Sequence, residues 1–175
     1  MDILNEINKE ISKERVSQIA AYIEADQQQF ATLMNIFLKG LYVTTQRAGW
    51  VLSECAIKNP NLVIPYFRNF IQKLQEPFAP DSVKRNIVRI WQFIDIPEEY
   101  EGDIYNICFG YLHSNEAIAV QVFSMTVCHH ITRNIPDLKT ELRLAIEDIV
   151  MKNQDGSAAI KSRAKKILAD LKKNK

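Results

Sequence analysis

The amino-acid sequence predicts an all-α fold built from stacked helical hairpins. Apolar residues repeatedly follow the spacing i, i+4, i+7, i+8 and i+11, which places them along one side of a three-turn helix. These apolar stripes recur at regular intervals along the chain. The chain has only five glycines, and no Asn-Gly or Asp-Gly pair joins two alternating segments, so β-hairpins are not expected.

The stripe occurs nine times, and each copy predicts one helix. A clear copy begins at Val63 and continues through Phe67, Phe70, Ile71 and Leu74. Weaker copies replace some of the large apolar residues with alanine, serine, threonine or cysteine. In chain order the copies begin at Ser12, Phe30, Thr44, Val63, Val83, Ile104, Val120, Leu138 and Ile160.

Prolines separate several of the stripes. Proline fits the first turn of a helix but not its interior, so Pro60, Pro77, Pro80, Pro97 and Pro136 each indicate a helix start or the gap before one. With these boundaries the predicted helices cover residues 12–24, 27–39, 44–58, 61–75, 81–95, 98–113, 116–133, 137–151 and 157–173, after a short helical turn near 2–9.

Every second stripe belongs to a longer period. These stripes begin at residues 12, 44, 83, 120 and 160, with separations of 32, 39, 37 and 40 residues. Two-helix units of this length are typical of an α-solenoid, in which each hairpin buries its stripe against its neighbours. A chain of 175 residues is long enough for one such array, so we expect a single domain over residues 1–175.

Nearly the whole chain resembles the HEAT/armadillo-like helical repeat superfamily, although individual copies of the motif are degenerate. The segment "LVIPYFRNFIQKLQEPFAPDSVKRNIVRIW" has the early proline Pro65, the turn residue Asp81, and the Val-Arg-x-x-Ala-x-x-x-Leu pattern with lysine in place of arginine. The segment "AIKSRAKKIL" is similar, whereas Thr44-Thr45 and Val120-Gln121 lack the basic residue. The resemblance implies a right-handed α-α superhelix of nine to ten helices in four to five hairpins, whose second helices line a concave binding face.

Composition excludes several classes of protein. The formal net charge of +1 gives no general attraction to nucleic acid or membranes. From Lys161 onward, seven basic residues and one acidic residue give +6, so the preceding residues carry −5. No segment approaches the about 18 apolar residues of a membrane span, and the N-terminus does not resemble a signal peptide. We therefore expect a cytoplasmic protein without membrane contact.

No residue pattern indicates catalysis, a metal or a cofactor. Cys55, Cys108 and Cys128 lie on the apolar stripes, where free cysteine is a small buried side chain. His129 and His130 follow Cys128 directly, but neighbouring helical residues point about 100° apart and cannot share a site. Zinc spacing and phosphate-binding glycine loops are absent, so no catalytic residue, metal ligand or cofactor is predicted.

A second set of residues forms a ridge beside the apolar stripe. Arg47, Trp50 and Glu54 lie three, six and ten residues after Thr44, within the segment "QRAGWVLSECA". The same offsets give Arg89 and Phe93 after Val83, His130 after Val120, and Arg163 and Lys166 after Ile160.

The ridge has two interpretations. Cations interleaved with aromatic rings along stacked helices could form a binding face. Alternatively, the ridge packs against the neighbouring repeat, with Arg47 and Glu54 paired across two turns. In either case we expect Ala48, Val51 and Leu52 to be buried, and Arg47 and Glu54 to be largely exposed.

The resulting functional hypothesis is a non-enzymatic scaffold that holds a protein or peptide in its concave face. The alternative is nucleic-acid binding, similar to the DNA-alkylation-repair glycosylases, which resemble HEAT arrays and hold duplex DNA in a basic groove. The charge of −5 before residue 161 counts against this alternative, because nucleic-acid affinity comes mainly from phosphate neutralisation. The candidate binding residues are Arg47, Trp50, Glu54, Arg85, Arg89, Phe93, His130, Arg163 and Lys166.

Overall fold

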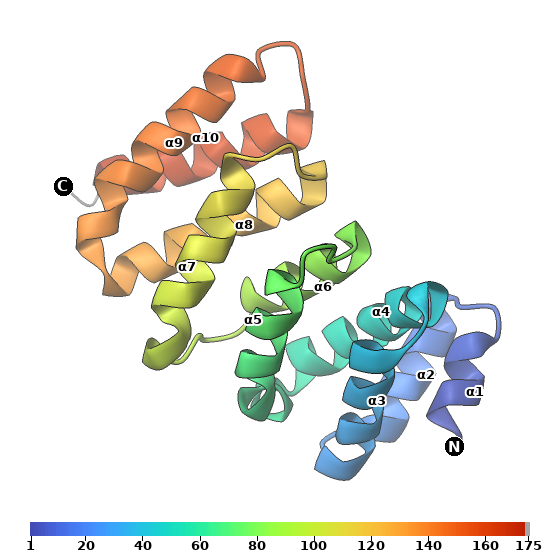
Figure 1. Cartoon of the computed structure of the whole chain (residues 1–175). Helices are drawn as coiled ribbons and strands as arrows, with labels where there is room; N and C mark the ends of the chain where they lie inside the picture. The colour runs from blue at the N-terminus through green and yellow to red at the C-terminus, as the bar shows by residue number, and fades with distance from the viewer. Residues whose placement is uncertain (174–175) are drawn as a thin grey trace. The chain divides into compact units, whose positions relative to one another are not determined.

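The computed structural model describes residues 1–173, and all regular elements within them are helical (Figure 1). Ten α-helices and three short 3₁₀ turns occur in this part of the chain. The all-α fold predicted from the stripes is confirmed.

The chain forms two compact units, Met1–Asp95 and Ile96–Lys175. Because each unit is compact by itself, the single domain expected over residues 1–175 stays a prediction. Unit 1 contains α1 (Ile3–Asn8), α2 (Lys13–Ile23), α3 (Gln27–Lys39), α4 (Tyr42–Lys58), α5 (Phe67–Gln75) and α6 (Asp81–Trp91). Unit 2 contains α7 (Glu98–Leu112), α8 (Ile118–Asn134), α9 (Lys139–Lys152) and α10 (Ala158–Lys173).

Polar side chains set the start of the first three helices. The Asp2 carboxylate accepts a hydrogen bond from the backbone N–H of Asn5 at 3.1 Å, and the Ser12 hydroxyl accepts one from Arg15 at 3.2 Å. Asp26 accepts from the backbone N–H groups of Gln28 and Gln29. These side chains satisfy N–H groups that have no partner within the helix itself.

Prolines shorten two helices relative to the prediction. The helix expected over 61–75 is two 3₁₀ turns, Pro60–Leu62 and Ile64–Tyr66, followed by α5 from Phe67. Pro65 lacks the N–H group that a continuous helix would use, which explains the interruption. In the same way, the helix expected over 137–151 begins with the 3₁₀ turn Pro136–Leu138 and becomes α9 only at Lys139.

The helix expected over 81–95 also ends early, at Trp91. Its last turn tightens, since the N–H of Phe93 donates to the carbonyl of Ile90 at 2.9 Å. Pro97 begins the next helix at its N-cap position and disfavours helical backbone at the residue before it.

The core of unit 1 is organised around α4, which packs against α1, α2, α3 and α6. Ala48, Val51 and Leu52 are fully buried, as expected. Figure 1 shows α3 in front of α4. An aromatic ring of α3 extends the core to α5. Phe37 contacts Phe70 edge to face, with ring centroids 6.3 Å apart.

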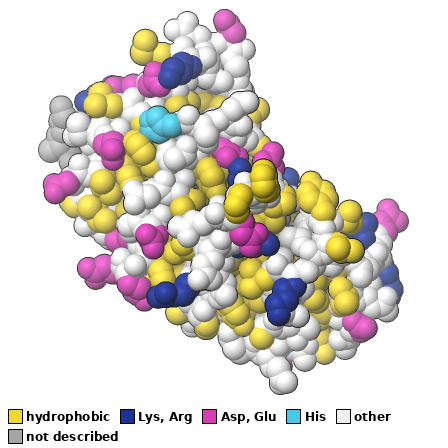
Figure 2. Space-filling model, in the orientation of Figure 1, with side chains coloured by type: hydrophobic (Ala, Val, Ile, Leu, Met, Phe, Trp, Pro, Cys, Tyr) yellow, Lys and Arg dark blue, Asp and Glu magenta, His cyan; other side chains and the backbone are white. Residues whose placement is uncertain are grey.

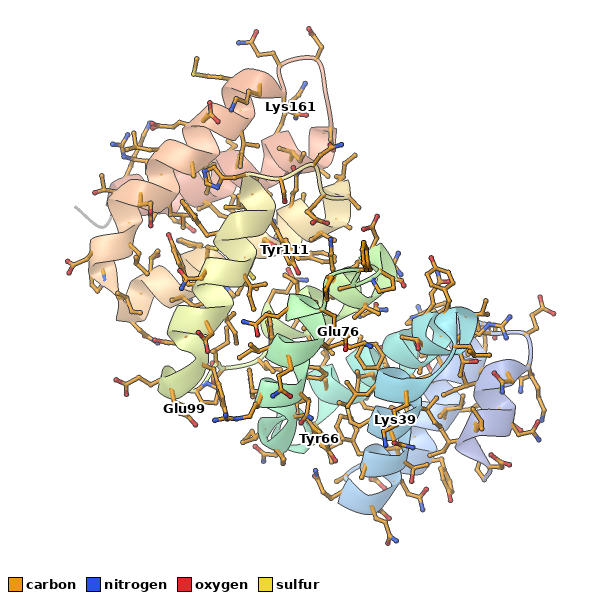
Figure 3. All side chains as sticks on the ribbon, in the orientation of Figure 1. Lys39, Tyr66, Glu76, Glu99, Tyr111 and Lys161 are labelled. Carbon is orange, nitrogen blue, oxygen red and sulfur yellow. The ribbon has the colours of Figure 1, made fainter. Side chains whose placement is uncertain are left out.

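The 3₁₀ turns of unit 1 also contribute to its core. Tyr66, labelled in Figure 3, ends the second turn and places its ring 5.7 Å from that of Phe30 on α3. Val63, between the two turns, is fully buried. The interrupted helix therefore still buries apolar side chains of the predicted stripe.

The core of unit 2 is organised around α8, which packs against α7, α9 and α10. Val127 and Ile131 of α8 are buried, as are Ile104 of α7 and Ile146 of α9. A carboxylate is also buried in this unit: Glu101 accepts a hydrogen bond from the Asn134 side-chain amide at 2.5 Å. This bond ties the first turn of α7 to the end of α8.

Gly49 allows α6 to approach α4 closely. A Cβ atom at Gly49 would lie 2.4 Å from Nδ2 and 3.0 Å from Cγ of Asn86, and 3.2 Å from the ring of Phe37. Asn86 is only 5% exposed, so its side chain has little room to move away. The close packing of α4 and α6 therefore depends on the absence of a side chain at position 49.

Replacing Gly49 with alanine should destabilise unit 1. The added methyl overpacks the α4–α6 contact, which costs about 1–3 kcal/mol and outweighs the better helix propensity of alanine. Urea unfolding measures the difference. The matched control is Gly102→Ala on α7, where a Cβ meets no atom within 4 Å, so the change should stabilise by about 0.5–1 kcal/mol. Equal effects of the two substitutions would contradict this account of Gly49.

His129 on α8 is a buried titratable group. Burial lowers its pKa below the ordinary value of 6.5, because the low-dielectric interior disfavours the charged imidazolium. Nearby Arg133, His130 and Lys139 lower the pKa further, while Asp170 opposes them. The native state therefore holds this imidazole neutral in a pH range where the unfolded chain binds a proton.

The stability of the protein should fall as the pH drops below about 6.5, the value expected for His129 in the unfolded chain. The depressed native pKa gives this sign, because unfolding takes up a proton on the acidic side of 6.5. Unfolding free energies measured by urea titration on both sides of that pH test it. In His129→Asn the slope should be shallower than in the wild type; an unchanged slope would show that other groups are responsible.

Candidate binding groove between α4 and α6

Unit 1 contains a groove of about 580 Å³ between α4 and α6. Four of the candidate binding residues line it. Its walls are formed by Ile11, Val43, Gln46, Arg47, Trp50, Arg85, Asn86 and Arg89.

The wall from α4 follows directly from helical spacing. Val43, Arg47 and Trp50 are separated by four and three residues, so they lie on one face of the helix. Trp50 is 41% exposed, whereas Trp91 is fully buried. Trp50 lies at a ridge offset, six residues after Thr44, whereas Trp91 lies at a stripe offset, eight residues after Val83. The structure leaves Trp50 accessible in the groove.

Arg47 joins α4 to the end of α1. Its Nη1 atom donates to the carbonyl oxygens of Asn8 and Lys9 at 2.9 and 3.0 Å, and to that of Ile7 at 3.4 Å. These carbonyls belong to the last turn of a helix and have no partner within it. Arg47 is consequently half-buried, and the expectation that it is largely exposed was wrong.

The predicted pairing of Arg47 with Glu54 is also wrong. Glu54 forms an ion pair with Lys58, one turn further along α4, with 3.2 Å between Nζ and Oε1. Its side chain is 32% exposed rather than largely exposed. Lys58 lies one helical turn from Glu54, whereas Arg47 lies two turns from Glu54. The Glu54 carboxylate therefore pairs with the nearer cation, Lys58.

The wall from α6 contributes Arg85 and Arg89. Arg89 donates from Nη1 to the hydroxyl of Ser53 on α4, and its guanidinium lies 5.8 Å from the ring centroid of Phe93. Phe93 is 54% exposed and follows the end of α6. Arg85 is exposed, and its side chain forms no hydrogen bond or ion pair with any residue in 1–173.

The groove is strongly positive for its size. Three guanidinium groups line it, and none of its lining residues is acidic. Guanidinium groups stay charged at all physiological pH values. The surface formed by α4 and α6 is therefore suited to an anionic group beside an aromatic ring.

Glu54 and Phe93 belong to unit 1 but do not line this groove, and the remaining three candidate residues lie in unit 2. Arg163 on α10 donates from Nη1 to the hydroxyl of Thr126 on α8, and Lys166 is exposed. His130 is half-buried on α8, where its ring centroid lies 6.3 Å from that of His129. The structure therefore brings Arg47, Trp50, Arg85 and Arg89 together and leaves Arg163, Lys166 and His130 apart.

Sequence reasoning did not include four lining residues among the candidates. Val43 and Gln46 precede Arg47 and Trp50 on the same face of α4, so helical spacing contains a signal for them. Asn86 occupies the ridge offset after Val83, although its burial against Gly49 was not foreseeable. Ile11 lies between α1 and α2, and nothing in the local sequence connects it with α4.

The three cysteines are buried and free. Burial raises the pKa of the Cys55 thiol to about 12 and raises that of Cys128 well above its ordinary value. The reactive thiolate is thus strongly disfavoured at both positions. Within residues 1–173, His, Cys, Asp and Glu form no group of three arranged to hold a metal ion.

Comparison with known protein families gives one match. The model of a HEAT repeat domain covers residues 3–171. The chain belongs to this HEAT repeat family. No curated protein and no solved structure matches the chain significantly.

The family assignment agrees with the arrangement of the helices. In this HEAT repeat domain α4 and α6 pack side by side in unit 1, and α8 and α10 do so in unit 2. The apolar stripes of these four helices begin at residues 44, 83, 120 and 160, which belong to the longer sequence period. The four helices are therefore the second helices of successive repeats. Among the described helices, none has the combination of length and apolar character that crossing a bilayer requires.

Removing the guanidinium of Arg47 should loosen the N-terminal helix. Arg47→Met keeps the apolar stem but removes the donor to the carbonyls of Ile7, Asn8 and Lys9 at the end of α1, and α1 is too short to persist without tertiary contacts. We expect a loss of about 1–2 kcal/mol in unfolding free energy, together with faster amide exchange in Ile3–Asn8.

The control for this change is Arg68→Met on α5, which removes an exposed arginine outside the groove. It should leave both the stability and the exchange of α1 unchanged. Normal protection of α1 in Arg47→Met would show that its contacts with the carbonyls do not hold the helix in place.

Proposed function

We propose that this HEAT repeat domain is a non-enzymatic binding module that holds a protein or peptide partner against the second helices of its repeats. The groove between α4 and α6 is the contact surface, and residues 1–175 act as one module in the cytoplasm. The observation that carries the proposal is the exposure of Trp50 within a groove lined by arginines.

An exposed tryptophan in a groove is a strong feature of an interaction surface. Tryptophan and arginine are enriched among the residues that dominate binding energy at protein interfaces. The indole ring offers a large apolar area with few rotatable bonds, so a partner gains contact area at a small cost in entropy. Trp50 and its arginine neighbours combine both residue types in one place.

Apolar side chains extend this surface beyond the groove. Leu41 and Tyr42, at the start of α4, are 84% and 61% exposed, and Val43 follows them into the groove wall. Figure 2 shows exposed hydrophobic side chains among lysines and arginines over the unit formed by α1–α6. Neighbouring apolar and cationic groups are typical of protein-binding surfaces.

Nucleic-acid binding is the second candidate function. Three arginines beside an accessible tryptophan could contact phosphates and stack a base. However, residues 1–95 contain eleven Lys and Arg and ten Asp and Glu, so the unit that contains the groove is nearly neutral. Affinity for nucleic acid depends on many neutralised phosphates, which favours the protein partner.

Trp50→Ala should abolish partner capture while leaving the fold intact. Because Trp50 is 41% exposed, we expect the change to cost about 1–2 kcal/mol of stability, below the about 3–5 kcal/mol typical of a fully buried large aromatic residue. Capture from native lysate, quantified by mass spectrometry, should lose the proteins that bind the wild type.

Phe78→Ala supplies the matched control. Phe78 is 93% exposed in the α5–α6 connection and does not line the groove. Its removal therefore tests whether loss of any exposed aromatic side chain abolishes partner capture. Captured proteins that persist in Trp50→Ala, or that are lost equally in Phe78→Ala, would argue against the groove. Tight binding of duplex DNA at low salt, with no captured protein, would instead support the second candidate.

A further inference from the structure

The groove gathers cations without carboxylates. Several lysine and arginine side chains elsewhere in unit 1 pair with nearby carboxylates, among them Arg15 with Glu6 at 2.7 Å and Lys73 with Glu76 at 2.9 Å. The groove has three guanidiniums and no acidic lining residue. Because the whole unit is nearly neutral, this local excess is not a consequence of a basic surface.

Two of the three guanidiniums are held in position by the fold. Arg47 is anchored to the carbonyls at the end of α1, and Arg89 is anchored to Ser53 on α4. Arg47 and Arg89 each use only Nη1 for these contacts. A guanidinium has five N–H donors, so both side chains keep further donors for a ligand. Arg85 has no partner within residues 1–173, so its whole guanidinium is available.

An apolar wall lies beside these donors. Val43 and Trp50 are both more than two-fifths exposed and line the same groove. A simple inorganic anion would satisfy the guanidiniums but would leave this wall exposed to water. The groove therefore fits an occupant that carries a carboxylate next to an apolar side chain.

We propose that the groove recognises an acidic segment of a partner protein, in which an aspartate or glutamate binds Arg85 and an adjacent apolar side chain packs on Trp50 and Val43. Guanidinium and carboxylate match in geometry and can form two parallel hydrogen bonds. This proposal rests on the proposed function, since it names the chemistry of the partner that the same groove holds.

Selection of peptides that bind the protein shows which side chains the groove prefers in a partner. Random peptides displayed on phage are selected on the full-length wild-type protein and, in parallel, on Trp50→Ala. We expect wild-type selection to enrich peptides with Asp or Glu next to an aliphatic or aromatic residue. Those peptides should not be enriched on Trp50→Ala.

The contribution of Arg85 is then measured with a selected peptide made synthetically. Arg85→Glu reverses the charge in the groove and should weaken binding by roughly tenfold or more, because it places a carboxylate against a carboxylate. Arg68→Glu makes the same charge change on the exposed surface of α5 and should change affinity by less than about twofold, because distant charges are screened by salt.

Reversing the charge of the peptide completes the test. A version with lysine in place of its acidic residues should bind Arg85→Glu better than it binds the wild type. Equal weakening by Arg85→Glu and Arg68→Glu would overturn the role of Arg85. Circular dichroism and thermal unfolding of each variant confirm that any loss of binding does not arise from misfolding.

The outcomes separate this proposal from the proposed function. Selected peptides without acidic residues, whose binding still requires Trp50, would overturn the acidic partner and leave the binding module in place. Absence of any peptide that depends on Trp50 would overturn both proposals. Single-stranded DNA that binds more tightly than every selected peptide, with the same dependence on Arg85, would also overturn the acidic segment as occupant.

Discussion

Within each unit of this protein, a helical hairpin completes the burial of its apolar stripes only by packing laterally on a neighbouring hairpin. This constraint makes the second helices neighbours: α4 lies between α2 and α6 in unit 1, and α8 packs on α10 in unit 2. Lateral packing requires close contact, and Gly49 provides it where Asn86 of α6 meets α4. The groove lies between α4 and α6, the two helices whose close contact depends on Gly49.

Arginines of the ridge reinforce the same lateral contacts. Arg89 bonds a residue 36 positions earlier and Arg163 one 37 positions earlier, while Arg47 bonds carbonyls 38 to 40 positions earlier. These separations match the repeat length, so each arginine reaches from one repeat to the preceding one. A guanidinium that uses one nitrogen for this purpose still offers other donors to solvent. Packing between repeats and presentation of a binding surface are therefore compatible roles for Arg47 and Arg89.

The sequence was sufficient for the features that depend on local spacing. The stripe through Val63 and Phe70 predicted buried helical faces because burial on a helix repeats every 3.6 residues. It could not decide the exposure of Trp50, since that depends on how closely α6 approaches α4 and not on the spacing within α4. The partner of Arg47 was likewise hidden, because the carbonyls of α1 are close in space but far away in sequence. Pro65 lay inside the helix expected over 61–75, where its missing N–H interrupts the helix, so α5 begins only at Phe67.

The composition of the groove has an electrostatic cost that the fold alone does not explain. Three like charges repel one another, and a carboxylate at position 43 or 46 would relieve that repulsion without disturbing the buried stripe. The chain instead has valine and glutamine at these positions. Anchoring of Arg47 and Arg89 by neighbouring helices fixes the cations before any ligand arrives, so less side-chain entropy is lost on binding. The contacts that stack the repeats thus also preorganise the positive groove, and an anionic partner is the species that would relieve its repulsion.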